Sequence, residues 1–143
     1  IVDAARSKDV YEFLTSKATK SECLYNGKAA IEMAEFAPYL VAFQDHLELH
    51  KFLELSWGKS WGIMFASRYS SEDLKHFFRQ FLLVDMPNGK KALFRFYDPR
   101  VFRDAFPGFE DSDRTRFLEM VTSFFVESTC AAKCLVLGRR SIE

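Results

Sequence analysis

The sequence predicts a mixed α/β domain in which a central sheet of about five or six strands is flanked by helices and includes one antiparallel hairpin. Apolar residues recur at a two-residue period in some segments and at a helical period in others, which is typical of strands interleaved with helices. The pair Asn88-Gly89 lies between two apolar runs and is a strong hairpin signal. No internal repeat or linker interrupts the chain, so we expect a single domain over residues 1–143.

The N-terminal third is expected to alternate short strands with helices. Extended segments are predicted over residues 1–5, 22–25 and 39–43, and a weaker helical pattern covers residues 29–35. Ser7 occupies the position of a helix N-cap, and apolar residues follow it at helical spacing. The helix after Ser7 would bury Val10, Phe13 and Leu14.

Two further helices are predicted in the middle of the chain, separated by a buried strand. Asp45, with Glu48 three residues later, resembles a capping box at the start of the first helix. That helix would bury Leu49, Phe52, Leu53 and Trp57. Residues 61–66 are nearly all apolar or glycine, as in a strand covered on both faces. Ser70 begins the second helix, and its buried face would consist of Leu74, Phe77, Phe78, Phe81 and Leu82.

The remaining segments are expected to add the hairpin, a helix and a last strand. Residues 83–86 and 91–97 would form the two strands of the hairpin on either side of the Asn-Gly turn. An amphipathic helical pattern covers residues 117–125, with passage into a strand as the alternative for its end, and a final strand is predicted over residues 132–137. The order of elements therefore remains that of a mixed α/β domain to the end of the chain.

The segment LFRFYDPRVF, residues 93–102, joins the hairpin to the next helix. Side chains alternate along a strand, so its first two phenylalanines are expected on the core face, opposite Arg95 and Tyr97. Asp98 occupies an N-cap position and Pro99 the first helical position, where a missing amide hydrogen costs nothing. Capping, worth about 1 kcal/mol, is a sufficient role for Asp98. Arg95 is expected either to pair with a carboxylate or to face a partner that supplies one.

Charge and hydropathy restrict the classes of partner. Lysine plus arginine number 20 and aspartate plus glutamate number 20, so no overall field attracts nucleic acid or an anionic membrane, and we expect neither partner. The chain shows no secretory leader and no apolar run near the roughly 18 residues that cross a bilayer, which predicts a cytoplasmic protein. Cys23, Cys130 and Cys134 are expected to be free thiols, the last two of them buried as small apolar residues.

Two patterns leave a small metal-dependent or Asp-dependent hydrolase as the alternative function. HLELH places His46 and His50 at a spacing that can hold two zinc ligands, and Cys130 and Cys134 could supply two more. The metalloprotease motif needs a glutamate directly after its first histidine, where this chain has leucine. Acid–base chemistry at Asp98 would need a second matched titratable group, and its sequence neighbours supply none. We therefore expect neither a metal nor a cofactor.

Five segments occur in an order that resembles a known family. They are VDAAR at residues 2–6, LYNG at 24–27, APYLVAF at 37–43, WGKSWGIMFAS at 57–67 and LKHFFRQFLLVDMPNGKKALFRFYDPRVF at 74–102. Together they resemble the adaptor or chaperone domain of bacterial type VI secretion, and the resemblance is loose from Phe109 onward. Members of that family usually carry a further C-terminal region, which makes this domain a candidate for the N-terminal lobe of a longer protein.

The resemblance implies a non-enzymatic cytoplasmic protein that binds a cognate toxic effector and loads it onto the spike protein VgrG before secretion. Aromatic and arginine side chains are common anchors of protein interfaces. The residues expected to contact a partner are therefore Arg95, Tyr97, Asp98, Arg100 and Arg103, followed by Trp57 and Trp61.

Overall fold

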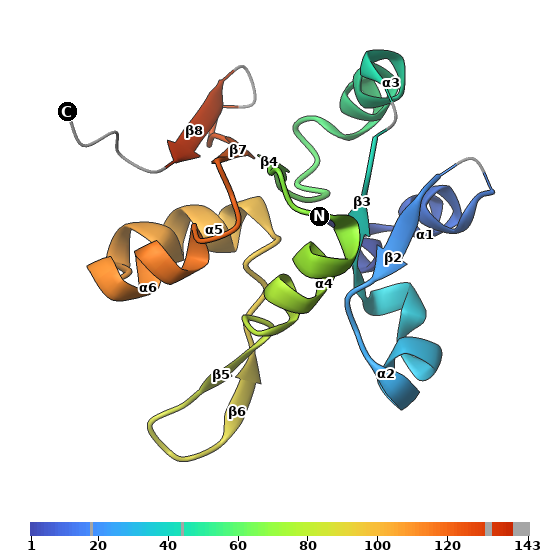
Figure 1. Ribbon diagram of the computed structural model, residues 1–143. Helices are drawn as coiled ribbons and strands as arrows, with labels where there is room; N and C mark the ends of the chain where they lie inside the picture. Colours follow the sequence, from blue (N-terminus) through green and yellow to red (C-terminus); the bar gives the residue numbers. More distant parts are fainter. Residues whose placement is uncertain (18, 44, 131–132, 139–143) are drawn as a thin grey trace.

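A computed structural model describes residues 1–17, 19–43, 45–130 and 133–138 of the chain (Figure 1). Within these residues, six α-helices and three small antiparallel sheets interleave, which confirms the predicted mixed α/β class. The prediction of a single central sheet of five or six strands is wrong, because the strands divide among three sheets. No helix in the described part of the chain is long and apolar enough to cross a membrane.

The N-terminal third forms the first sheet and its helices. In spatial order, the strands are β1 (Val2–Asp3), β3 (Pro38–Val41) and β2 (Ser21–Cys23). The helical segments are η1 (Ala4–Arg6), α1 (Lys8–Thr15), α2 (Gly27–Glu32) and η2 (Ala34–Phe36). The predicted cap of α1 is confirmed, since the Ser7 hydroxyl accepts from the Val10 amide at 3.3 Å. Val10 and Leu14 are buried and pack in one apolar cluster with residues of β1 and β3.

The second sheet is formed mostly by the C-terminal part. Its strands, in spatial order, are β4 (Met64–Ala66), β7 (Ser123–Glu127) and β8 (Cys134–Gly138). The helical segments of this part are α5 (Pro99–Ala105), η3 (Phe106–Gly108) and α6 (Asp111–Phe117), and α5 and α6 lie beside each other in Figure 1. For residues 117–125 a continuous helix is wrong, whereas the alternative of passage into a strand is confirmed. Helix α6 ends at Phe117, and β7 instead buries Phe124 and Val126 on one face, as a strand with two-residue spacing does.

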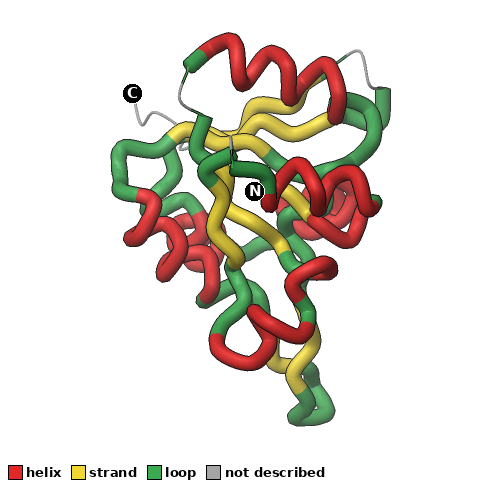
Figure 2. Tube along the Cα trace, turned by 90° about the vertical axis from the view of Figure 1, so that its right-hand side faces the viewer, coloured by secondary structure: helices red, strands yellow, loops and turns green. Residues whose placement is uncertain are grey.

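Two capped helices and a hairpin complete the domain. They are α3 (His46–Ser56), α4 (Ser71–Arg79), β5 (Leu83–Asp85) and β6 (Lys91–Leu93). Asp45 accepts from the Glu48 amide at 2.9 Å and Ser70 accepts from the Asp73 amide at 3.1 Å, which confirms both predicted helix starts. The hairpin projects away from the other elements (Figures 1 and 2). The buried strand predicted over residues 61–66 is shorter than expected, because β4 starts at residue 64 and Ala66 is exposed.

The first two sheets meet at one point, beside Gly62. An isolated antiparallel bridge joins Val2 to Gly62, the Asp3 amide donates to the Trp61 carbonyl at 2.7 Å, and the Ile63 amide donates to the Ile1 carbonyl at 3.0 Å. A Cβ atom on Gly62 would lie 2.0 Å from the Ile1 carbonyl oxygen, so only glycine permits this approach. The two sheets therefore diverge from a narrow junction.

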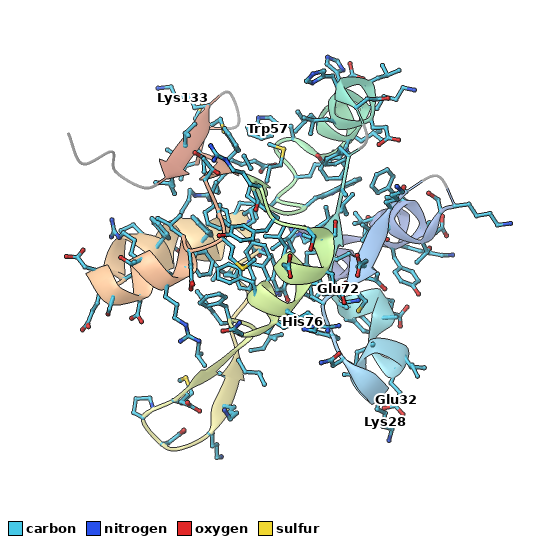
Figure 3. All side chains as sticks on the ribbon, viewed as in Figure 1. Lys28, Glu32, Trp57, Glu72, His76 and Lys133 are labelled. Carbon is cyan, nitrogen blue, oxygen red and sulfur yellow. The ribbon has the colours of Figure 1, made fainter. Side chains whose placement is uncertain are left out.

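Aromatic side chains fill the core between α4, α5, α6 and β7. Phe78, Phe96 and Phe124 are fully buried, while Lys28 and Glu32, labelled on α2 in Figure 3, point outward. The alternation predicted for residues 93–97 is wrong. β6 ends at Leu93, and Phe96 and Tyr97 are then both buried, because the chain turns and the Asp98 amide donates to the Arg95 carbonyl at 3.0 Å. All three cysteines are free, but Cys130 and Cys134 are exposed and not buried as predicted.

Candidate functional site

The seven residues predicted to contact a partner fall into two groups. Four of them, Arg95, Tyr97, Asp98 and Arg100, belong to the first group. This group also contains Asp3, Arg6 and Tyr25, and is called here the arginine corner. The second group surrounds Glu127 and includes Trp57, Trp61 and Arg103. Whether these residues contact a partner remains a prediction, but the structure shows how each side chain is held.

Asp98 has the capping role that the sequence predicts. Its Oδ1 atom accepts from the Arg100 amide and from Arg100 Nε, both at 3.0 Å, and its Oδ2 atom accepts from Arg100 Nη2 at 2.6 Å. Burial alone would raise the pKa of Asp98, but the hydrogen bonds from Arg100 outweigh it and hold the pKa below its ordinary value. The carboxylate is therefore ionised and already engaged on both oxygens.

Arg95 pairs with a carboxylate, which is one of the two outcomes expected for it. Its Nη2 atom donates to Oδ2 of Asp3, a side chain with no exposed surface, whose other oxygen accepts from the Ala5 amide at 3.1 Å. Residues 92 positions apart thus share an ion pair in which the carboxylate is buried and the guanidinium is partly exposed. A pair of this kind is costly to break, because the buried carboxylate alone would be an uncompensated charge.

The corner offers guanidinium groups to solvent, whereas the ring of Tyr97 is buried and that of Tyr25 is half-buried. Tyr97 is only 1% exposed and its hydroxyl is hydrogen-bonded to Tyr25. Burial raises the pKa of the Tyr97 phenol above its ordinary value, so the hydroxyl stays protonated. In contrast, 39% of the Arg95 side chain and 53% of the Arg100 side chain are exposed. A partner at this corner would therefore meet the arginines first.

Glu127, which the sequence analysis did not single out, organises the second group. Its carboxylate accepts from the Gly58 amide at 3.0 Å and the Ser60 amide at 3.2 Å. Gly58 and Ser60 have φ values of 81° and 55°, so the turn after α3 runs through the left-handed region. Arg103 holds the same strand end by donating from Nη1 to the Glu127 carbonyl at 2.6 Å. The turn thereby fixes the positions of Trp57 and Trp61 on either side of it.

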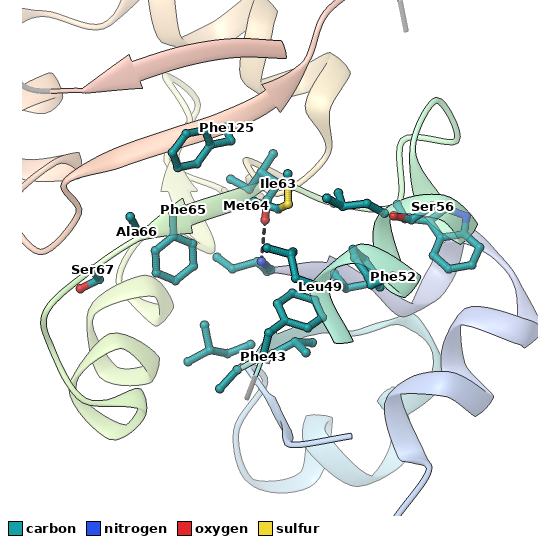
Figure 4. Close-up of a pocket in the computed structure, with 18 of the residues that line it drawn as sticks. Phe43, Leu49, Phe52, Ser56, Ile63, Met64, Phe65, Ala66, Ser67 and Phe125 are labelled. Atoms are coloured by element: carbon teal, nitrogen blue, oxygen red, sulfur yellow. Dashed lines mark hydrogen bonds between the residues drawn. The ribbon is translucent and has the colours of Figure 1, made fainter. Parts of the chain in front are cut away.

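An apolar groove of about 640 Å³ lies beside these tryptophans, between α3 and the strands of the first two sheets. Figure 4 shows its side chains converging from α3, β4, β7 and the segment after β3. The apolar side chains that line it include Phe43, Leu49, Leu53, Met64, Phe65 and Phe125. The groove reaches the surface at Ala66 and Tyr69, which are exposed. Val2 and Gly62 also line it, so the groove lies over the junction of the two sheets.

The apolar surface continues from the groove onto β8. Met64 pairs with Phe125, and Phe125 pairs with Val136, so the three side chains share one face of the second sheet. Val136 is 61% exposed. Two polar side chains in the groove wall already have partners, because Ser67 donates to the Met120 carbonyl at 2.6 Å and Glu127 accepts from the turn. The surface is therefore suited to apolar contact.

Comparison with known proteins identifies the family of the chain. A family model described as a domain of unknown function, DUF4123, matches residues 1–116. The chain belongs to the DUF4123 family. No curated protein and no solved structure matches it. The matched part of this DUF4123 domain contains the whole arginine corner and both tryptophans, whereas β7 and β8 lie beyond it.

The histidines and cysteines behind the metal-dependent hydrolase alternative are exposed, whereas Asp98, the basis of the Asp-dependent one, is buried. His46 and His50 are exposed on α3, and His50 Nδ1 lies 3.5 Å from an oxygen of Glu54. Within the described residues, no group of three or more histidine, cysteine or acidic side chains is placed to hold a metal ion. Cys130 and Cys134, proposed as further ligands, are exposed at and after the turn that precedes β8.

Sequence reasoning missed Asp3, Arg6, Tyr25 and Glu127. Asp3, Arg6 and Tyr25 belong to quoted motifs, but the residues of the corner that they approach lie about 70 to 90 positions along the chain, and no local pattern identifies them. Glu127 could have been identified from the sequence, because it ends the apolar run SFFVE and a carboxylate on a buried strand needs a partner.

Proposed function

We propose that this DUF4123 domain is a type VI secretion adaptor that binds a cognate effector in the cytoplasm and helps to load it onto the VgrG spike. The proposal rests on the ordered sequence segments that resemble such adaptors. The structural observation that carries it is the open apolar groove over the junction of the two sheets. The mechanism is binding, in which an effector segment is held by shape and by apolar contact.

The groove has the chemistry expected of a site for an apolar polypeptide segment. Phe43, Phe65 and Phe125 are half-buried around it, so each retains apolar surface that a partner could cover. Each square ångström of apolar surface removed from water contributes about 25 cal/mol. The cross-strand row that ends at Val136 extends the contact beyond the groove itself. An effector segment bound here would be protected from aggregation, because a partner that binds only the protected state stabilises it by mass action.

Co-purification tests the proposal. The DUF4123 domain is co-expressed with the effector and spike encoded beside its gene, and the affinity-purified sample is passed over a size-exclusion column. The expected result is a complex that contains the effector, with or without the spike. An effector from an unrelated secretion system serves as the matched control and is expected to elute separately. Recovery of neither partner by a folded DUF4123 domain would contradict the proposed function.

A further inference from the structure

The arginine corner carries one more cation than its carboxylates can neutralise. Arg6, Arg95 and Arg100 are arranged around two carboxylates, Asp3 and Asp98. Both carboxylates are buried, with exposures of 0% and 2%, and form the floor of the corner. The guanidinium groups of Arg95 and Arg100 lie above this floor and reach solvent. A further anion can therefore approach only from the arginine side.

Among the described residues, Arg6 has no hydrogen-bond or ion-pair partner. It lies in η1, the turn that Asp3 caps, and it is half-buried. Its Nε atom is buried and has no hydrogen-bond acceptor within the described residues. Its charge helps to keep the pKa of Asp98 low, but no hydrogen bond or ion pair joins Arg6 to the described part of the domain.

The other half-buried arginines all have acceptors. Arg79 donates to the carbonyls of Leu24 at 2.9 Å and Tyr25 at 3.0 Å, and Arg103 donates to the Glu127 carbonyl at 2.6 Å. Arg114 also has a buried Nε atom without an acceptor within the described residues, but its Nη2 atom donates to the Phe106 carbonyl at 3.4 Å and its guanidinium group covers the Phe106 ring. A half-buried guanidinium without an acceptor loses hydrogen bonds that it would make to water. Arg6 is thus placed for an acceptor that the described residues do not supply.

The neighbouring arginines also retain donors. Arg95 donates to Asp3 from Nη2, and Arg100 donates to Asp98 from Nε and Nη2, so Nη1 remains on both side chains. Arginine nitrogens match the two oxygens of a carboxylate and bind it in a bidentate manner. One additional carboxylate would balance the three cations with three anions.

We infer that Arg6, Arg95 and Arg100 form a receptor for a carboxylate side chain from an acidic segment of a partner polypeptide. The inference rests on the proposed function, which makes the partner an effector polypeptide. The groove is the first contact of that effector, and the carboxylate bound by the arginine corner is the second. Nucleic acid is disfavoured because the ring of Tyr97 is buried and offers no stacking surface, and because the chain has no net positive charge. The receptor is separate from the apolar groove in its residues, so each contact can be removed alone.

Titration with a short acidic peptide tests the receptor directly. The probe is a capped hexaglutamate peptide, its control is capped hexaglutamine, and the readout is the NMR signal of each arginine Nε–H group. The expected result is that hexaglutamate shifts the signals of Arg6, Arg95 and Arg100, whereas hexaglutamine does not. Absence of these shifts, or equal shifts at arginines elsewhere in the domain, would overturn the inference.

Two substitutions that each remove one positive charge sharpen the test. Arg6→Gln is expected to weaken hexaglutamate binding about tenfold, because it removes a charge-assisted contact. Lys17→Gln, at an exposed site after α1, is expected to leave binding unchanged. Equal effects of the two variants, or preferential binding of inorganic phosphate or an oligothymidylate over hexaglutamate, would overturn the inference. If Arg6→Gln does not fold, the shifts of the wild-type arginine Nε–H signals on addition of hexaglutamate still test whether the receptor exists.

The same variants separate this inference from the proposed function. If wild-type protein recovers the effector and Arg6→Gln recovers it equally well, the receptor is wrong and the adaptor function stands. If wild-type protein recovers no partner but binds hexaglutamate through Arg6, the adaptor function is wrong and the receptor stands.

Discussion

Asp3 shows how one carboxylate supports the arginine corner. It is fully buried, accepts from the Ala5 amide and pairs with Arg95, which lies 92 residues further along the chain. Asp3→Asn keeps the size of the side chain but leaves the Arg95 guanidinium without its counter-charge. We expect a loss of about 3 kcal/mol in the free energy of unfolding, measured by urea denaturation.

Asp104→Asn is the matched control for Asp3→Asn. Asp104 is exposed on α5, so removal of its charge is expected to change the free energy of unfolding by less than about 0.5 kcal/mol. Equal stability of the two variants would contradict the structural role of Asp3. The same ion pair makes Arg95 a poor place to test partner binding, because a charge reversal there would set two carboxylates together.

The charge of Asp98 makes a pH-dependent contribution to stability. Hydrogen bonds from Arg100 hold its pKa below the ordinary value, so folding favours the ionised form. This contribution is present above the ordinary carboxyl pKa and is lost as the pH falls through the lowered pKa. Asp98→Asn retains an oxygen that can cap α5 but removes the charge. We expect the variant to be less stable than wild type at about pH 7 and the difference to narrow towards about pH 2.

Urea denaturation midpoints of wild type and Asp98→Asn across that pH range provide the measurement. A stability difference that does not depend on pH would show that the capping geometry, and not the charge, is what the substitution disturbs. Asp104→Asn, at an exposed carboxylate on α5, controls for the general effect of removing one negative charge.

At the scale of elements, the turn after α3 depends on a side chain from β7. Glu127 accepts from the Gly58 and Ser60 amides, and Ser60 adopts a positive φ that is unusual for a residue with a Cβ atom. Glu127→Ala would leave both amides without their acceptor. We expect a loss of about 2 kcal/mol in the free energy of unfolding and faster hydrogen exchange at these two amides.

Ser60→Gly provides a contrasting variant at the same turn. Glycine adopts positive φ without steric cost, so this change is expected to preserve or slightly raise stability. Faster exchange spread evenly over the domain in Glu127→Ala would indicate global destabilisation and would contradict a local role for the carboxylate.

The elements that depend on local interactions were predictable from sequence. Ser7, Asp45, Ser70 and Asp98 each accept from a backbone amide within three residues, so a short pattern contains the whole cap. The Asn-Gly hairpin was predictable for the same reason, since its turn and both strands are contiguous. Strand pairing was not predictable, because β4 pairs with β7 across about sixty residues and no local pattern encodes that choice.

The candidate site was only partly predictable, for the same physical reason. The quoted motifs led to Arg95 and Arg100, and the arginine-and-aromatic composition led to Trp57 and Trp61. Neither showed that Arg6 would lie beside Asp98, since their proximity depends on the tertiary fold. The buried position of Tyr97 was missed because the strand ends at Leu93, where the predicted alternation stops.

For the whole molecule, the groove is a consequence of how the two sheets meet. A bridge at Gly62 and the adjacent backbone bonds join them. The buried apolar side chains form two clusters, and the cluster that contains Phe124 of β7 also includes Leu40 of β3. The groove is lined by members of both clusters, among them Phe65 from one and Phe43 from the other. α3 lies along this opening and contributes Leu49 and Leu53. The groove thus lies over the bridge that joins the two sheets.

Phe125 allows the groove to be tested apart from the core. It is half-buried on the open face of β7, between Met64 and Val136, whereas its neighbour Phe124 is fully buried on the opposite face. Phe125→Asn is expected to reduce recovery of the co-expressed effector about tenfold while costing only about 1 kcal/mol of stability. Phe124→Ala is expected to cost about 3–5 kcal/mol, since it removes a core aromatic ring.

Ile31→Asn is the matched surface control, because Ile31 is 81% exposed on α2 and lies outside the groove. Effector recovery should survive this change, since an exposed apolar side chain outside the interface contributes little to binding. Equal loss of recovery in Ile31→Asn and Phe125→Asn would show that general surface polarity controls the complex. Undiminished recovery in Phe125→Asn would place the effector elsewhere on the domain. Only selective loss at Phe125, with stability retained, is the outcome that an effector segment lying in the groove requires.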